Sequence, residues 1–244
     1  MRLILTLNSK KEIILPLYYN EILQGFIYKN IEKSIAEEIH NRGFLFEKRN
    51  FKLFTFSRLI GKTKIEKSFF KIFTPSKLII SSPYNEMLQS LAENLIKWHE
   101  LKLGDNTLYI ESISIHYTPE IKETVFIRML SPITIYSTLN TPDGRKKTYY
   151  YNPKEKEFSE LIRENIIKKY IAFYRKTPLS KEFTIEPLKV TREDEKIVSY
   201  KGFIIKGWMG KYRLNGSKEL LQLAYDGGIG AKNSQGFGCF EVEG

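Results

Sequence analysis

The apolar residues of this chain predict strands and helices in one order, β-α-β-β-α-β, which occurs twice along the sequence. In the first half, alternating apolar residues predict a strand at Met1–Leu7, and helical spacing predicts helices at Tyr18–Ile31 and Asn85–Leu101. The other strands predicted in this half are Phe51–Ile60, a pair within Ser68–Ser82 that turns at Pro75–Lys77, and Asn106–Tyr117.

The second half repeats this order of elements. Helical spacing predicts a long helix at Glu155–Tyr174 and a short one at Ser217–Tyr225. The strands predicted around them are Thr124–Tyr136, which is followed by a loop at Asn140–Gly144, and then Phe183–Val190, Lys196–Leu214 and Gly238–Val242. The βαββαβ order is that of a ferredoxin-like unit. The predicted fold class is therefore α+β, with tandem ferredoxin-like (βαββαβ) domains.

The boundary between the two domains is predicted in the polar stretch Thr118–Lys122, which contains Pro119. It gives an N-terminal domain at 1–120 and a C-terminal domain at 121–244. No residue-level repeat accompanies this division, so the duplication is inferred from element order alone. A chain of 244 residues is long enough for one large domain or two small ones.

A formal net charge of +11, from 39 Lys and Arg against 28 Asp and Glu, indicates an anionic partner, either nucleic acid or a membrane surface. The 16 Phe and 15 Tyr offer stacking surfaces for unpaired bases. The sequence contains no basic amphipathic helix with a bulky apolar face, and no apolar run approaches the roughly 18 residues that span a bilayer. We therefore expect a nucleic-acid partner and no membrane.

Cysteine and histidine usage argues against disulfides and metal ligands. Cys239 is the only cysteine, which excludes an internal disulfide and suits a reducing cytoplasm. The three histidines, His40, His99 and His116, are scattered and have no spacing typical of zinc ligands. The sequence thus predicts a cytoplasmic protein with no metal site and no cofactor.

Two Gly-x-Gly pairs, Gly228–Gly230 and Gly236–Gly238, stand close to the C-terminus on either side of Lys232. Glycine permits positive φ and close approach of the backbone to a partner. Successive N–H groups in such a segment, helped by the charge of Lys232, could hold a phosphate. The spacing differs from that of a dinucleotide fingerprint and of a P-loop. From these residues alone, a tight turn and an anion site are equally good interpretations.

The whole segment 228–238, Gly-Ile-Gly-Ala-Lys-Asn-Ser-Gln-Gly-Phe-Gly, resembles the signature of the repeat-associated RNA-binding superfamily. Within that superfamily it is most similar to the sixth Cas family, the CRISPR-associated endoribonucleases that cut precursor CRISPR RNA within its repeats. The resemblance extends over the chain, to the Met-Arg start, Leu-Gln-Gly-Phe-Ile-Tyr at 23–28, Leu-Phe-Thr-Phe-Ser at 53–57 and Leu-Ser-Pro-Ile at 130–133. That family folds as tandem ferredoxin-like domains, in agreement with the element order.

The resemblance implies a catalytic group of Tyr28, His40 and Lys52 in the N-terminal domain. Such enzymes let the 2′-hydroxyl of the RNA attack the neighbouring phosphate without a metal, which leaves a 2′,3′-cyclic phosphate and a 5′-hydroxyl. This step needs a base, an acid and a cation. His40 suits the acid and Lys52 the cation. Tyr28 is either the base or, because a phenol has a reference pKa of about 10, a group that positions the 2′-hydroxyl.

Tyr28 and His40 can meet only if the chain between them is not one continuous helix, in which twelve residues would separate them by about 18 Å. The sequence Ser34-Ile-Ala-Glu37 has the pattern of a capping box, which predicts a fresh helix from Ile35. Gly43 is placed to end that helix. Two short helices that fold back would bring His40 near Tyr28 and the strand that carries Lys52.

RNA contacts are predicted in two segments. The first is a basic hairpin followed by Tyr149–Tyr151. Its run of charged residues is equally consistent with a turn that is only solvated and binds no RNA. The second is the glycine-rich segment. The residues predicted to bind RNA are Arg145, Lys146, Lys147, Gly228, Gly230, Lys232, Asn233, Ser234, Gly236 and Gly238.

The main alternative function is a non-catalytic subunit of a CRISPR effector complex, which would bind repeat RNA with the same fold and the same glycine-rich segment. His40 together with Lys52 favours the nuclease, whereas His99 and His116 are predicted to be structural. The predicted partner is CRISPR repeat RNA for both functions. The sequence leaves open whether the protein joins a CRISPR interference complex or forms a homodimer.

Overall fold

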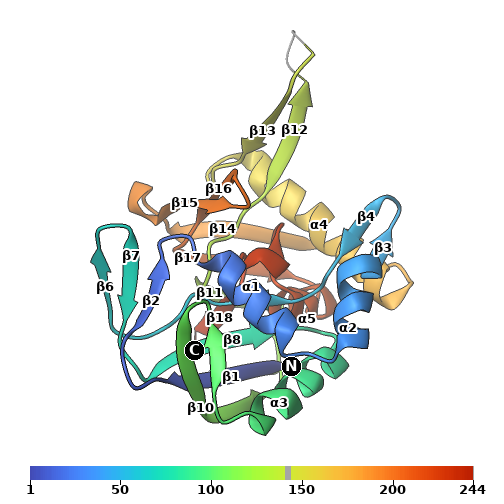
Figure 1. Ribbon diagram of the computed structural model, residues 1–244. Coiled ribbons are helices and arrows are strands. Elements are labelled where there is room, and N and C mark those ends of the chain that lie inside the picture. Colours follow the sequence, from blue (N-terminus) through green and yellow to red (C-terminus); the bar gives the residue numbers. More distant parts are fainter. Residues whose placement is uncertain (141–143, 244) are drawn as a thin grey trace.

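The computed structural model describes residues 1–140 and 144–243, which fold into two antiparallel sheets with two helices against one face of each (Figure 1). Its helices are α1 (Asn20–Lys29), α2 (Lys33–Glu37), α3 (Asn85–Lys97), α4 (Lys156–Tyr174) and α5 (Lys218–Gly227). Within the described residues, no helix has the length and apolar character needed to cross a membrane.

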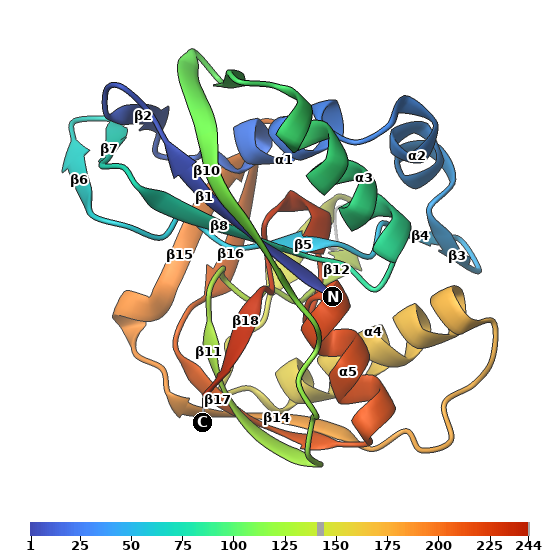
Figure 2. The same ribbon diagram turned by 90° about the horizontal axis from the view of Figure 1, so that it is seen from below.

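The first sheet has the strand order β5-β8-β1-β10-β9, and Figure 2 shows β8, β1 and β10 side by side with α3 alongside them. Leu3, Leu5 and Leu7 alternate along β1 and are fully buried in a core shared with α1 and α3. The strands of this sheet are β1 (Arg2–Asn8), β5 (Thr55–Phe56), β8 (Ser76–Ser81), β9 (Leu101–Leu103) and β10 (Asn106–His116).

The second sheet has the strand order β14-β17-β11-β18, and the apolar stripe of α4, with Phe158, Ile162 and Ile166, is buried against it together with α5. Both sheets place the second, third, first and fourth strands of a βαββαβ unit in that order. The prediction of an α+β fold with tandem ferredoxin-like units is therefore confirmed. The strands of this sheet are β11 (Thr124–Met129), β14 (Phe183–Lys189), β17 (Lys211–Gly216) and β18 (Phe240–Glu243).

Smaller ribbons are inserted between these elements, and the β12–β13 hairpin projects beyond the body of the molecule (Figure 1). One ribbon has three strands, in the order β2 (Ile13–Pro16), β7 (Phe69–Ile72) and β6 (Thr63–Glu66). The others are hairpins of β3 (Phe44–Phe46) with β4 (Arg49–Phe51), β12 (Tyr136–Asn140) with β13 (Lys146–Tyr150), and β15 (Glu195–Tyr200) with β16 (Phe203–Trp208).

The long strand predicted at Phe51–Ile60 is wrong. Only Thr55–Phe56 pairs with β8 as a strand, because Leu53 adopts a positive φ of 49°, which interrupts the extended chain. Phe51, on the other side of this break, pairs with Phe44 in the β3–β4 hairpin. The break matters for the site because Lys52 lies immediately before it.

The strand predicted at Lys196–Leu214 is also wrong as one element, since it forms β15, β16 and β17. The chain turns at Lys201–Gly202 and at Gly210, all of which have positive φ. The strand predicted at Thr124–Tyr136 ends as β11 at Met129. Of the loop predicted at Asn140–Gly144, residues 141–143 lie outside the described residues.

The two sheets are held together by a side chain at the start of β1. The Arg2 guanidinium is buried and donates hydrogen bonds to the carbonyl oxygens of Phe240 (2.6 Å) and Tyr225 (2.7 Å). It also lies 3.4 Å from the centroid of the Tyr225 ring, in cation–π geometry. The second residue of the chain thereby fixes the first sheet against the end of α5 and the last strand.

Candidate active site

The chain between Tyr28 and His40 is broken into separate helical segments, as the sequence predicts. α1 ends at Lys29, where the Asn30 side chain donates a hydrogen bond to the main-chain carbonyl one turn back (2.7 Å). The next helix begins at Lys33. Because the helix axis is interrupted here, the second segment folds back beside the first.

The capping box predicted for this second helix is wrong, because α2 begins two residues earlier than Ile35. The first helical hydrogen bond is accepted by the carbonyl of Glu32, from the N–H of Ala36 (2.8 Å). Ser34 therefore lies inside the helix, and its hydroxyl donates to the Glu32 carboxylate (2.7 Å) instead of accepting from the main chain.

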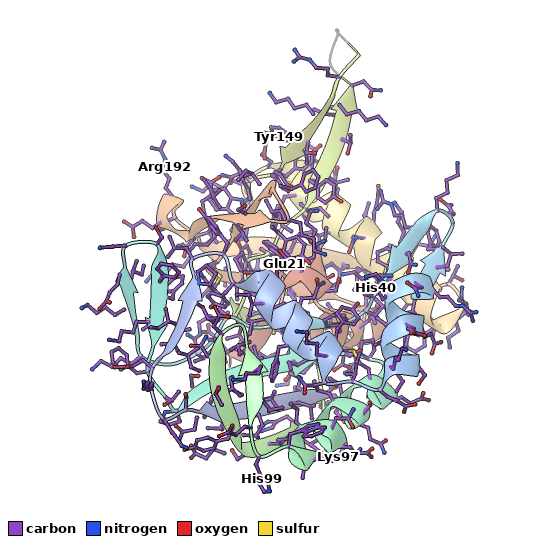
Figure 3. All side chains as sticks on the ribbon, viewed as in Figure 1. Glu21, His40, Lys97, His99, Tyr149 and Arg192 are labelled. Atoms are coloured by element: carbon purple, nitrogen blue, oxygen red, sulfur yellow. The ribbon has the colours of Figure 1, made fainter. Side chains whose placement is uncertain are left out.

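His40 sits on a π-helical segment, Glu38–Arg42, that continues α2. Gly43 ends this segment at a positive φ of 53°, and its N–H donates to the carbonyl of Glu38 (2.8 Å). A Cβ on Gly43 would lie 2.6 Å from the carbonyl oxygen of Phe51, so a side chain is excluded there. The wide turn buries Ile39 and leaves the His40 side chain exposed, near the β3–β4 hairpin (Figure 3).

Tyr28 and His40 meet across this fold. Their ring centroids are 5.8 Å apart and the ring planes are nearly perpendicular, at 81°. Tyr28 is half-buried and also packs edge-on against Phe54, with centroids 5.6 Å apart. The phenol is thus held in place from within the core, while the imidazole faces solvent.

Lys52 completes the group. Its ammonium donates a hydrogen bond to the main-chain carbonyl of His40. Partial burial lowers the pKa of Lys52 below its ordinary value. The structure therefore brings together all three residues that the sequence singled out, on α1, the π-helical segment and the chain after β4.

Burial raises the pKa of the Tyr28 hydroxyl above its ordinary value, and the nearby phenol of Tyr200 adds to this effect. Tyr28 consequently keeps its proton at neutral pH. Its hydroxyl can exchange hydrogen bonds with a substrate group, but a phenolate base is disfavoured.

A cavity of about 460 Å³, here called the Tyr28–His40 cavity, opens beside these rings. Gln24 and Tyr28 of α1 line it together with His40, and Lys201 reaches it from the β15–β16 turn. Lys201 has a positive φ of 48°, which a tight turn requires. Sequence reasoning missed this lysine, because a Lys-Gly turn carries no sign of where its hairpin will lie.

A second cavity, of about 500 Å³ and here called the Asn165 cavity, lies next to the first. It is lined by Arg49–Leu53 on one side, by Ile135, Tyr136 and Thr138 on another, and by Asn165, Lys169 and Gly230–Gln235 at its remaining walls. Lys52 therefore belongs to the wall of this cavity while its ammonium contacts the main chain of His40.

The glycine-rich segment, residues 228–238, folds around a buried lysine that sequence reasoning missed. The ammonium of Lys169 on α4 donates to the carbonyl oxygens of Gly228 and Gly230 (2.8 Å each) and to Oδ1 of Asn233 (2.6 Å). The Asn233 amide in turn donates to the main chain of the same segment. The apolar stripe of α4 gave no hint of Lys169, because a lysine in a helical pattern is expected to be solvated.

The glycines of this segment are required by close packing. A Cβ on Gly230 would lie 2.5 Å from the carbonyl oxygen of Thr134, and one on Gly238 would lie 2.0 Å from that of Ile229. The N–H groups of Gly228, Gly236 and Gly238 each donate to a carbonyl oxygen of the protein. Lys232 and Ser234 are half-buried and line the Asn165 cavity with Gly230 and Asn233. RNA contact by this segment stays a prediction.

The glycine-rich segment is fastened to the helix that carries Tyr28. Asn20 donates to the carbonyl of Gln235 (2.8 Å), and Gln24 donates to that of Ser234 (2.6 Å). The side-chain oxygen Oε1 of Gln24 accepts a hydrogen bond from the hydroxyl of Tyr200. Residues of the second half of the chain therefore set the position of α1.

The predicted basic hairpin is the β12–β13 ribbon. Arg145, Lys146 and Lys147 are exposed on it, next to a cluster of tyrosine rings that pairs Tyr136 with Tyr150. The ribbon begins at Tyr136, which lines the Asn165 cavity. Basic and aromatic residues thus continue from the cavity onto the β12–β13 hairpin, which projects beyond the body of the molecule (Figure 1).

Lys169 makes the stability of the fold depend on pH. Burial lowers its pKa from 10.5 to about 7, so between these values the unfolded chain binds a proton that the folded chain does not. The free energy of unfolding is therefore expected to rise with pH, by about 2 kcal/mol from pH 7 to pH 9. Urea unfolding of the wild type and of Lys169→Met at both pH values measures this contribution.

Lys168→Met is the matched control, because Lys168 is paired with Glu164 on the outer side of the same helix (3.1 Å). It should keep the rise with pH, which Lys169→Met should lose. An equal rise in all three proteins would contradict the assignment to Lys169.

Two family models match the chain in succession. The model described as "CRISPR-associated protein Cas6, N-terminal" matches residues 14–114, and "CRISPR associated protein Cas6, C-terminal" matches residues 116–242. The sequence is also 30% identical over 247 residues to "CRISPR-associated endoribonuclease Cas6 1" of Methanocaldococcus jannaschii, which covers 98% of this chain and 91% of the relative.

Solved structures with the same fold extend over the whole chain. The product of a Cas6-related gene from Pyrococcus furiosus superposes with a TM-score of 0.86 at 27% identity, covering 100% of this chain and 98% of that one. A structure titled "An RAMP protein binding different RNA substrates" has a TM-score of 0.84 at 25% identity and covers 100% of both chains.

Proposed function

Because the chain belongs to the Cas6 family of CRISPR-associated proteins, we propose that it is an endoribonuclease that cuts precursor CRISPR RNA within its repeats without a metal ion. Relatives across nearly the full length are named endoribonucleases, which supports the activity. The relative titled as binding different RNA substrates supports RNA as the ligand.

One observation carries the proposal: Tyr28, His40 and Lys52 come from three separate elements and meet at His40, whose ring packs against Tyr28 and whose main-chain carbonyl accepts a hydrogen bond from Lys52. A phenol, an imidazole and an ammonium are the groups needed to cleave RNA through its own 2′-hydroxyl. His40 is exposed and lines the Tyr28–His40 cavity, where a substrate phosphate can reach it.

In the proposed reaction, the 2′-oxygen attacks the adjacent phosphorus while the bond from phosphorus to the 5′-oxygen breaks. Tyr28 hydrogen-bonds the 2′-hydroxyl and orients it, and the hydroxyl proton leaves to solvent. His40, as the imidazolium, donates a proton to the departing 5′-oxygen. Lys52 stabilises the charge that develops on the phosphorane. The products are a 2′,3′-cyclic phosphate and a 5′-hydroxyl.

The RNA is proposed to reach this group along the Asn165 cavity and the β12–β13 hairpin. Lys232, Asn233 and Ser234 of the glycine-rich segment and Arg145–Lys147 of the hairpin supply its polar and basic surface. Phosphate contacts of this kind provide affinity with little dependence on base sequence. The tyrosines at the base of the hairpin offer faces for unpaired bases.

Cleavage is expected to proceed unchanged in excess EDTA, because proton transfer and charge stabilisation are assigned to side chains alone. Repeat RNA from the protein's own genome, incubated with the pure protein, should yield two products of defined size, with and without the chelator. Loss of cutting in EDTA and its return with magnesium would contradict the mechanism. Tight binding without any cutting would favour the non-catalytic RNA-binding subunit instead.

A further inference from the structure

We propose that the Asn165 cavity is a specificity pocket for one unpaired base of the RNA, adjacent to the cut, and that Asn165 recognises the exocyclic amine of that base. The proposal rests on the proposed function for the identity of its ligand. It adds a preference: adenine, guanine or cytosine, each of which carries an exocyclic amine, binds more tightly than uracil, which has none.

Unpaired acceptor atoms in the cavity wall are the first argument. Asn165 is only 6% exposed, and its Oδ1 has no hydrogen-bond partner among the described residues. Oε1 of Gln235, another residue of the cavity lining, is likewise buried without a partner. Buried polar atoms are rarely left unpaired. Two unpaired acceptors on residues that line one cavity call for a ligand that brings donors, as an exocyclic amine does.

The charge of the wall is the second argument. Arg49, Lys52, Lys169 and Lys232 line the cavity, and no described residue of its lining is acidic. Lys169 adds little to this charge, because its Nζ is buried against three protein acceptors and burial lowers its pKa. A ligand that carries both a negative charge and an amine-bearing ring fits this wall, and a nucleotide has both.

The size and shape of the cavity are the third argument. A volume of about 500 Å³ falls in the range of pockets that enclose one small ligand. The ring of Tyr136 forms part of its wall, with the Lys232 ammonium 5.0 Å from the ring centroid. An unpaired base can stack on such a ring, as bases do in single-stranded RNA recognition.

Lys52 places this pocket beside the cut. Its side chain lines the Asn165 cavity, and its ammonium contacts the main chain of His40 in the neighbouring cavity. A nucleotide whose base occupies the pocket therefore has its phosphate next to the residue assigned to the phosphorane charge. The base that is recognised belongs to one of the two nucleotides that flank the scissile phosphate.

Deaminated RNA tests the pocket independently of cleavage. The probe is repeat RNA with a 2′-deoxy nucleotide upstream of the cut, so that it binds without being cut. Each flanking base is then replaced in turn by a counterpart that lacks the exocyclic amine, here called deaminated: inosine for adenosine or guanosine, and uridine for cytidine. One of these replacements is expected to weaken binding to the wild type about tenfold, because an amine–acceptor bond is lost.

The variants Asn165→Ala and Gln235→Ala complete the test as a double-mutant cycle. In Asn165→Ala, the deaminated and unmodified RNAs should bind equally. Asn215→Ala, on β17 and outside the lining of the cavity, is the control and should keep the tenfold discrimination. If Asn165→Ala does not fold, the same comparison is made with Gln235→Ala, which removes the second unpaired acceptor. Its side chain is only half-buried, so this variant should fold.

Equal binding of all deaminated RNAs to the wild type would overturn the pocket, and so would a tenfold loss that persists unchanged in both variants. Uridine on both sides of the natural cut would overturn it as well. These outcomes leave the proposed function intact, since that function is tested by cutting of unmodified RNA. Conversely, discrimination in binding by a protein that cuts nothing would support the pocket and contradict the nuclease.

Discussion

Replacing the 2′-hydroxyl of the nucleotide immediately upstream of the cut by hydrogen is expected to abolish cleavage. The proposed nucleophile is that hydroxyl, and the protein offers no substitute for it at Tyr28 or His40. Without the 2′-oxygen there is no atom to form the cyclic phosphate, so the loss is one of chemistry and not of affinity.

Binding provides the control for this experiment. The deoxy RNA should bind as tightly as the unmodified RNA, because affinity comes mainly from phosphate contacts and stacked bases. Mapping the product ends of the unmodified RNA should give a 2′,3′-cyclic phosphate and a 5′-hydroxyl. If the deoxy RNA is cut efficiently to a linear phosphate, the nucleophile is water and the roles assigned to Tyr28, His40 and Lys52 are wrong.

The second large effect is expected from His40→Ala, which should slow cleavage by about 10²-fold or more while RNA affinity stays nearly unchanged. The imidazole is the proposed proton donor to the 5′-oxygen, and its removal leaves that oxygen to depart as an alkoxide. His40 is exposed and contributes little to the core, so the variant should fold normally. Single-turnover rates at saturating protein separate the chemical step from binding.

His99→Ala is the matched control for His40→Ala. His99 is also exposed but lies beyond the end of α3, away from His40 (Figure 3). It should cut at the wild-type rate. Lys52→Ala should be slow like His40→Ala and should also bind RNA less tightly, because it removes a charge from beside the phosphate. Wild-type cleavage by His40→Ala would show that the catalytic group is placed wrongly.

The fold was predictable because the alternation of apolar residues reports which residues face a core. Leu3, Leu5 and Leu7 are such a pattern, and they define β1 correctly. The pattern failed where backbone conformation interrupts an apolar run, at the positive φ of Leu53 and at the turn Lys201–Gly202. Apolar periodicity does not register such turns, and only the second of them contains a glycine.

The candidate site was predictable in part. The resemblance to known nucleases pointed to Tyr28, His40 and Lys52, and the structure brings the three together. Gly43 was correctly predicted to end the helical segment, whereas Ser34 does not cap it. The predictions of helix ends depended on residues that are close together in the sequence, and such short patterns can be identified without a structure.

Contributions from the second half of the chain were not predictable. Lys201, Tyr200 and the buried Lys169 reach the site through tertiary packing. Their spacing along the sequence says nothing of that arrangement. The packing of the two ferredoxin-like units against each other decides which surface residues become neighbours. This packing produces no periodic pattern in the sequence.

The contacts of Arg2 and of α1 also determine when this site can exist during protein synthesis. Arg2, Asn20 and Gln24 are synthesised early, but the carbonyl oxygens they bind belong to Ser234, Gln235 and Phe240, which are synthesised much later. A nascent chain can form its first sheet beforehand, since domains near the N-terminus fold first. Its helix with Tyr28 then lacks the support of the glycine-rich segment. A nascent chain that has not yet reached Phe240 is therefore not expected to have the candidate site in the geometry described above.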